Sequence, residues 1–131
     1  MCDKNAGAAN SYLLHLGAHP RAPKTARTAL RTKLRDWNLS HLIDDAELVT
    51  AELATNAMKR GLPFTLELSK GDTSVLIEVT DTSDGTPVVI DNTGNATAEE
   101  GRGIYLVDLL SKEWGVRPTG KGKTVWARVG T

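Results

Sequence analysis

The chain has 131 residues, of which 40% are hydrophobic, and this size fits one globular domain with a core of its own. Sixteen basic residues balance sixteen acidic ones, so the composition argues against a dedicated nucleic-acid binder or a binder of anionic membranes. No apolar run approaches the roughly 18 residues of a membrane span, and MCDKNAGAAN lacks the features of a secretion signal, so we expect a cytoplasmic protein.

The first part of the chain is predicted to form a tail, a short strand and a helix. We expect residues 1–10 to be a flexible tail and residues 11–131 to form the domain. The apolar segment from Tyr12 to Leu16 predicts an edge strand, which HPRAP ends. A helix is predicted from Pro23 to Trp37, because apolar residues recur there at helical spacing: Ala26, Leu30, Leu34 and Trp37. Its basic residues form either a solvated surface or a site for an acidic partner: Lys24, Arg27, Arg31, Lys33 and Arg35.

A second helix is predicted from Asp44 to Gly61, where Gly61 acts as a C-terminal cap. Its apolar stripe consists of Leu42, Ala46, Val49, Leu53 and Ala57. Asp45, Glu52 and Asn56 line one flank of that stripe, at the edge of the core. Glu52 and Asn56 are one turn apart and can direct a carboxylate and an amide oxygen into one small volume, as a metal-bound phosphate beside a base requires. The alternative is a polar pair that only stabilises the helix.

The next segment changes to a period of two and predicts an antiparallel hairpin. In its first strand Phe64, Leu66 and Leu68 alternate with polar residues, and its second strand repeats the pattern with Val75, Ile77 and Val79. Between Asp81 and Glu100 no period is sustained, which predicts a loop of about twenty residues, and loops of that length are usually functional or disordered.

The last part of the chain is predicted to form a third helix and a final strand. The helix starts at Gly101 to Gly103, Gly115 ends it, and one face carries Ile104, Val107, Leu110 and Trp114. The final strand runs from Thr124 to Val129. Together these elements predict a two-layer α/β sandwich in which three helices cover one face of a mostly antiparallel sheet.

Three glycine-containing signals follow the second helix, and they are compatible with a nucleotide site. Asp81, in DTSDG, ends a strand and can accept a hydrogen bond from the exocyclic amine of adenine, while Gly85 permits a tight turn against a flat ligand. Gly101 and Gly103, in GRGIYLV, occupy a predicted helix N-terminus, which favours phosphate. Thr124, in GKT, can offer a hydroxyl beside Asp81. Taken singly, each is also ordinary as a turn, helix-start or strand residue.

Other candidate sites are weaker. His15, His19 and His41 lack the spacing of zinc ligands. Lys121 and Lys123 flank a glycine near the supposed site and could reach a phosphate, but a basic hairpin tip is the simpler interpretation. GKGKT is not a phosphate loop of the Walker type, because it lacks the preceding strand and the following helix.

In this arrangement the chain resembles the Bergerat-type ATP-binding domain shared by DNA gyrase, heat-shock chaperones, histidine kinases and mismatch-repair ATPases. It is most similar to the anti-sigma-factor serine/threonine kinases of the RsbW and SpoIIAB kind, in particular their short actinobacterial members. DDAELVTAELATNA looks like the box that bears the catalytic Glu and the magnesium-binding Asn. DTSDG, GRGIYLV and GKTVWARV look like the two glycine boxes and the closing threonine strand.

The resemblance implies a role for each matching residue. Glu52 would be the base that orients the attacking hydroxyl, and Asn56 would supply an oxygen to Mg²⁺. Asp81 and Thr124 would read adenine, with Gly85 in the first glycine box. The phosphates of ATP would meet Gly101, Arg102 and Gly103. Two features depart from the family pattern: Ser83 stands where glycine is usual, and the lid, residues 88–100, is short.

The function implied by the resemblance is a switch. Such a kinase would hold a sigma factor, bind ATP and Mg²⁺, and phosphorylate Ser or Thr of an antagonist protein, and related kinases imply a homodimer. The alternative is a non-catalytic module whose affinity for a partner depends on ATP. A detached histidine-kinase catalytic domain is a third alternative, although no helix carries a phosphoacceptor His in a dimerisation pattern.

Overall fold

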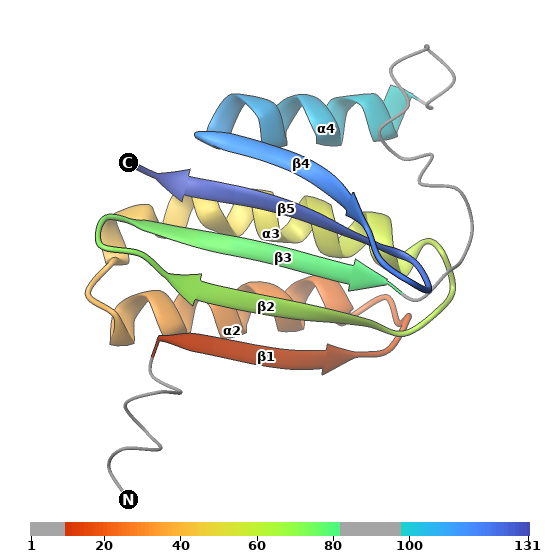
Figure 1. The fold of residues 1–131 in the computed structure, drawn as a ribbon, viewed down its shortest axis with the longest axis horizontal. Coiled ribbons are helices and arrows are strands. Elements are labelled where there is room, and N and C mark those ends of the chain that lie inside the picture. Colours follow the sequence, from red (N-terminus) through yellow and green to blue (C-terminus); the bar gives the residue numbers. More distant parts are fainter. Residues whose placement is uncertain (1–9, 82–97) are drawn as a thin grey trace, which may run out of the picture.

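One antiparallel sheet with the strand order β1-β2-β3-β5-β4 forms the first layer of the fold, and the helices form the second (Figure 1). The structure is a computed structural model, and it describes residues 10–81 and 98–131. Its strands are β1 (Ser11–Leu16), β2 (Phe64–Lys70), β3 (Ser74–Asp81), β4 (Glu113–Pro118) and β5 (Lys123–Gly130). Its helices are α2 (Ala22–Asp36), the short 3₁₀ helix η1 (Ser40–Leu42), α3 (Ile43–Met58) and α4 (Ala98–Leu110). The predicted two-layer α/β sandwich with three helices is confirmed.

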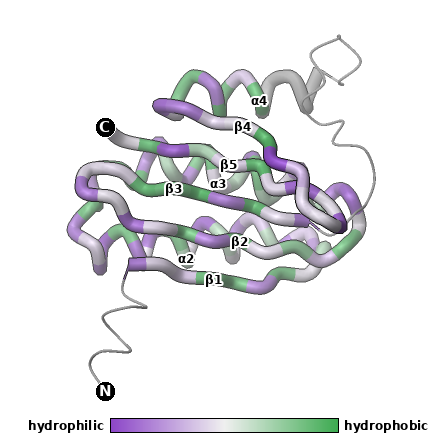
Figure 2. The backbone as a smooth tube through the Cα atoms, in the orientation of Figure 1, coloured by the Kyte–Doolittle hydropathy of each residue, from purple (hydrophilic) through white to green (hydrophobic). Residues whose placement is uncertain are grey.

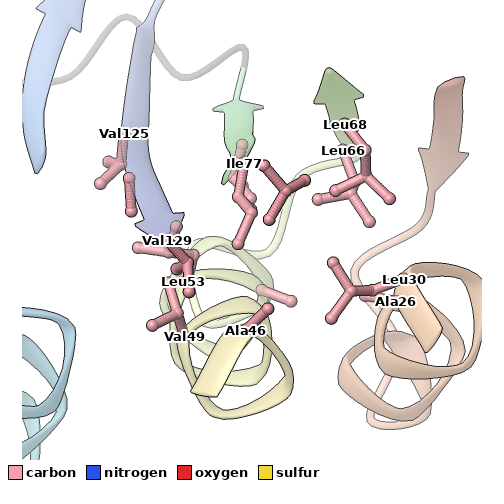
Figure 3. Close-up of a cluster of buried hydrophobic side chains, with 14 of the residues drawn as sticks. Ala26, Leu30, Ala46, Val49, Leu53, Leu66, Leu68, Ile77, Val125 and Val129 are labelled. Carbon is pink, nitrogen blue, oxygen red and sulfur yellow. The ribbon is translucent and has the colours of Figure 1, made fainter. Parts of the chain in front are cut away.

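The core lies between the sheet and helices α2 and α3 (Figure 3). Alternate residues of the strands point toward the helices, so polar and apolar residues alternate along them (Figure 2). The predicted hairpin residues are all buried: Phe64, Leu66, Leu68, Val75, Ile77 and Val79. Burying one such side chain stabilises the fold by about 1.5–3 kcal/mol. The period of two therefore identified the inner face of the hairpin correctly.

The first two predicted helices are confirmed, with small shifts at their ends. Every apolar residue of the first predicted stripe is buried, including Trp37 directly after α2, as are Ala46, Val49, Leu53 and Ala57 in α3. Helix α3 ends at Met58, before the predicted Gly61. Gly61 donates its amide hydrogen to the carbonyl of Met58 at 3.0 Å and has a φ of 80°. Glycine adopts this left-handed conformation without steric cost, so the chain leaves the helix there.

The predicted end of the third helix is wrong, and a fifth strand was missed. Helix α4 ends at Leu110, and the amide of Lys112 already donates to the carbonyl of Arg128 in β5 at 2.7 Å. Trp114 and Gly115 therefore belong to β4, which pairs with β5 along its whole length. A Cβ atom on Gly115 would lie 3.0 Å from the ring of Trp126, so glycine at this position leaves room for that ring.

Three of the elements that bear candidate residues meet at one end of the sandwich. The end of α3, the end of β3 and the start of β5 all lie at the right of Figure 1. Within the described residues, no helix is both long enough and apolar enough to cross a membrane. The predicted tail falls on residues 1–10, of which only Asn10 is described, and most of the predicted loop, 82–97, lies outside the described residues.

Candidate functional site

Asp81 and Lys123 form a buried ion pair at this end of the sheet. They are direct partners in the antiparallel register of β3 and β5, so their side chains leave the sheet on the same face. The Nζ atom of Lys123 lies 2.9 Å from Oδ2 of Asp81, and the side chains are 3% and 4% exposed. Val79 and Val125, two residues away on each strand, share this face and belong to the core. Both charges therefore point toward the helix layer.

Lys123 does not lie at a basic hairpin tip, where the simpler interpretation of the sequence placed it. Lys121 is exposed in the β4–β5 turn, as that interpretation requires, but Lys123 is the first residue of β5 and is buried. A buried ammonium group requires a paired charge, because burial without one costs several kcal/mol. Asp81 supplies that charge. The sequence contains one signal for this: Lys123 precedes Val125 by two residues, so both occupy the same face of a strand.

Thr124 was predicted to lie beside Asp81, and this prediction is wrong. Its register partner is Thr80, and the two hydroxyl oxygens lie 2.7 Å apart. Successive residues of a strand point to opposite faces, so Thr124 and Thr80 lie on the face away from the helices. The residue that accompanies Asp81 is therefore Lys123, one position earlier in the chain.

A small pocket joins the ion pair to helix α3. It is lined by Leu53, Asn56 and Ala57 from α3, by Val79 and Asp81 from β3, and by Lys123 and Val125 from β5. Its volume is about 10 Å³, which is room for about one water molecule. A purine base can enter only if side chains at this pocket move.

Asn56 is the polar residue that α3 contributes to the pocket. Its Nδ2 atom is buried, and within the described part of the chain it has no hydrogen-bond partner. Leaving a buried amide unpaired typically costs about 1–3 kcal/mol, which a ligand with polar atoms would recover. The amide also has an oxygen, the kind of ligand that Mg²⁺ accepts, so Asn56 fits the metal-binding role in its donor chemistry.

Glu52 lies one helical turn before Asn56 and is half-buried. It does not line the pocket beside Asp81, so a group that occupies this pocket meets the carboxylate of Asp81 and not that of Glu52. No three His, Cys, Asp or Glu side chains gather into a metal site among residues 10–81 and 98–131. Mg²⁺ usually binds through one or two protein ligands together with substrate phosphates, and such a site needs no cluster of that kind.

The glycine boxes are only partly covered by the structure. Gly85 lies outside the described residues. Gly101, Arg102 and Gly103 are helical residues of α4, which begins at Ala98, three residues before the predicted start. Their approach to phosphates stays a prediction.

A second, larger pocket lies away from this site, between the edge strand β1 and helix α2. Its volume is about 710 Å³, and its lining is Tyr12, Leu14, Arg21, Lys24, Thr25, Thr28 and Ala29. The ammonium group of Lys33 lies over the ring of Tyr12, 5.0 Å from its centre. This groove therefore combines apolar side chains with positive charge.

Comparisons with solved structures agree with this architecture. The chain is similar to the RsbU and RsbW domains of Rv1364c from Mycobacterium tuberculosis, with a TM-score of 0.65 and 21% identity over 91% of the chain. It is also similar to the histidine kinase domain of a blue-light activated histidine kinase from Erythrobacter litoralis, with a TM-score of 0.54 and 20% identity over 70% of the chain. The chain spans 32% and 45% of those two proteins, so the likeness concerns the fold of one part of each.

Comparison with protein families extends the likeness to the sequence itself. No curated protein has a sequence that matches the chain. A family model described as the histidine kinase-like ATPase domain matches residues 16–129, a range that includes α3, both strands of the ion pair and α4. An ATPase domain implies ATP binding, and the chain belongs to the histidine kinase-like ATPase domain family.

Proposed function

We propose that the protein is an ATP-dependent switch of the anti-sigma-factor type, which transfers a phosphoryl group from ATP to Ser or Thr of an antagonist protein. The observation that carries this proposal is the arrangement on α3. Asn56 faces the pocket of Asp81 with a buried amide nitrogen that has no hydrogen-bond partner among the described residues, and half-buried Glu52 lies one turn away. This arrangement offers a separate group for each part of the reaction: Asp81 for adenine, Asn56 for a metal-bound phosphate and Glu52 for the attacking hydroxyl.

In the proposed mechanism, each residue acts on a different part of the substrate. Asp81 accepts a hydrogen bond from the amine of adenine, and Gly101 to Gly103, in the first turns of α4, let the phosphates approach that helix closely. Asn56 would hold Mg²⁺ through its amide oxygen, and a bound Mg²⁺ neutralises charge on the phosphates. Glu52 orients the hydroxyl of the antagonist and accepts its proton. Phosphoryl transfer depends mostly on positioning and electrostatics, and these few groups supply both kinds of contribution.

We place the partner surface on α2 and on the groove beside it. Arg21 and Lys24 line that groove, and Lys33 lies over Tyr12 at its side, so the surface has the charge that an acidic partner segment needs. The proposed partners are a sigma factor and an antagonist protein, which the protein would meet in the cytoplasm. We also propose that the protein forms a homodimer. Light scattering over a concentration series tests the dimer, because a dimer dissociates on dilution.

The test of the proposed function is transfer of labelled phosphate to a co-purified partner. The tagged protein is recovered with its partners, terminally labelled ATP and Mg²⁺ are added, and the label is followed on each protein. Label on Ser or Thr of a partner supports the kinase. If ATP binds but no partner gains label, the non-catalytic ATP-gated module replaces the kinase. Absence of ATP binding would reject both.

A further inference from the structure

We propose that Lys123 reads the base in this site: its ammonium group donates a hydrogen bond to ring nitrogen N1 of adenine while Asp81 accepts one from the exocyclic amine. The proposal rests on the proposed function, since it assumes that adenine enters the pocket lined by both residues. It assigns specificity to a residue that stands beside Asp81 because of the β3–β5 register.

The ion pair offers the adenine edge one donor and one acceptor side by side. Lys123 has three N–H donors, and its contact with Oδ2 of Asp81 at 2.9 Å uses one of them. A carboxylate has about four acceptor positions, so Asp81 can accept from the amine as well as from Lys123. Adenine presents an amine donor next to a ring-nitrogen acceptor, which is the edge that a paired acceptor and donor recognise. The pair thus imitates a side-chain amide.

Burial decides which edge of adenine meets the pair. Asp81 and Lys123 are 4% and 3% exposed, and the apolar side chains of Leu53, Val79 and Val125 surround them. The ribose and phosphates must remain outside so small a pocket, so the part of the base farthest from the sugar enters deepest. That part is the six-membered ring, which carries N1 beside the amine. The other ring nitrogen next to the amine, N7, lies in the ring that bears the sugar.

Lys123 is also the side chain best able to make room for the base. The pocket of about 10 Å³ is lined otherwise by short or branched side chains that pack in the core, apart from Asn56 and Asp81. Lysine has a flexible four-carbon stem, so its ammonium group can shift along the carboxylate without leaving it. Such a shift weakens the contact between the ammonium group and Asp81, and the new hydrogen bond to the base compensates for it. The competing possibility is a plug, in which Lys123 must leave Asp81 before any base can enter.

The experiment measures the affinities of three nucleotides by calorimetry: ATP, 1-deaza-ATP, which lacks N1, and 7-deaza-ATP, which lacks N7. In the unaltered protein we expect 1-deaza-ATP to bind about 10- to 100-fold more weakly than ATP, the usual effect of one hydrogen bond to a charged group. We expect 7-deaza-ATP to bind as ATP does. This comparison requires no substitution, so the folding of a variant cannot obscure it.

The variant Lys123→Met then tests whether Lys123 is the donor. It should bind ATP and 1-deaza-ATP equally, while the matched control Lys121→Met, which removes an exposed lysine from the same hairpin, should behave as the unaltered protein does. Equal binding of ATP and 1-deaza-ATP by the unaltered protein overturns the proposal, as does a loss confined to 7-deaza-ATP. Tighter ATP binding by Lys123→Met also overturns it and identifies a plug. If no adenine nucleotide binds at all, the proposed function itself has failed.

Discussion

Glu52 is the residue that separates a kinase from a protein that only binds ATP. Replacing it with Gln keeps the length and shape of the side chain but removes the group that accepts the proton. We expect phosphoryl transfer to the antagonist to fall by about 10²–10⁴. ATP affinity should hardly change, because Glu52 does not line the pocket beside Asp81. Single-turnover transfer and calorimetry measure the two quantities, and undiminished transfer by Glu52→Gln would reject Glu52 as the base.

Asn56 should fail in a different way when it is replaced. Asn56→Ala removes the proposed oxygen ligand, so ATP affinity in the presence of Mg²⁺ should fall by about tenfold or more, while affinity measured with a chelator should change less. The variant also removes a buried Nδ2 atom that has no hydrogen-bond partner within residues 10–81 and 98–131, so loss of that atom should not weaken the fold. Titrations with and without Mg²⁺ make the comparison. An equal loss in both conditions would assign Asn56 to the nucleotide and not to the metal.

At the scale of the elements, the pairing of β3 with β5 makes Asp81 and Lys123 energetically dependent on one another. Lys123→Met or Asp81→Asn alone leaves one buried group without its charged partner, which typically costs about 3–5 kcal/mol. The double variant should cost clearly less than the sum of the two. Urea unfolding of the four proteins gives the coupling energy. Additive losses would show that the two side chains do not form a pair in solution.

The elements also show what periodicity reveals and what it leaves open. The apolar patterns of α2, α3, β2 and β3 predicted their inner faces, because burial of one face fixes a period of 3.6 or 2. Strand β4 was missed because Trp114 continues the helical spacing of Val107 and Leu110, although Trp114 and Val116 also alternate with more polar neighbours. The pattern alone cannot choose between these periods. The hydrogen bonds to β5 do.

Several candidate residues could be predicted from the sequence, but the register between β3 and β5 could not. Glu52, Asn56 and Asp81 were identified because each sits at a recognisable place in a helix or at a strand end. Lys123 and Thr124 are neighbours in sequence, and only the partner strand determines which of them faces Asp81. A shift of one residue in that pairing would exchange the faces of the two.

At the scale of the whole molecule, ATP should stabilise the fold by binding to the native state alone. At a ligand concentration of 100 times Kd the free energy of unfolding should rise by about 2.7 kcal/mol, and the melting temperature should rise with it. GTP should give a smaller shift, because guanine presents a carbonyl where adenine presents the amine to Asp81. Thermal unfolding with each nucleotide measures this. Equal shifts would remove Asp81 from its assigned role in base selection.

The position of β5 has a consequence for how the protein acquires its activity during folding. Asp81 and Lys123 are separated by 42 residues, whereas β2 and β3 form a hairpin of neighbouring strands, and α2 and α3 follow one another closely along the chain. Contacts that are distant in sequence form late, because a long loop must close first. A partly folded chain with its helices and hairpin in place would still lack one wall of the base pocket. In refolding experiments, nucleotide binding should therefore appear with the slowest phase, after most of the helical circular dichroism signal has returned.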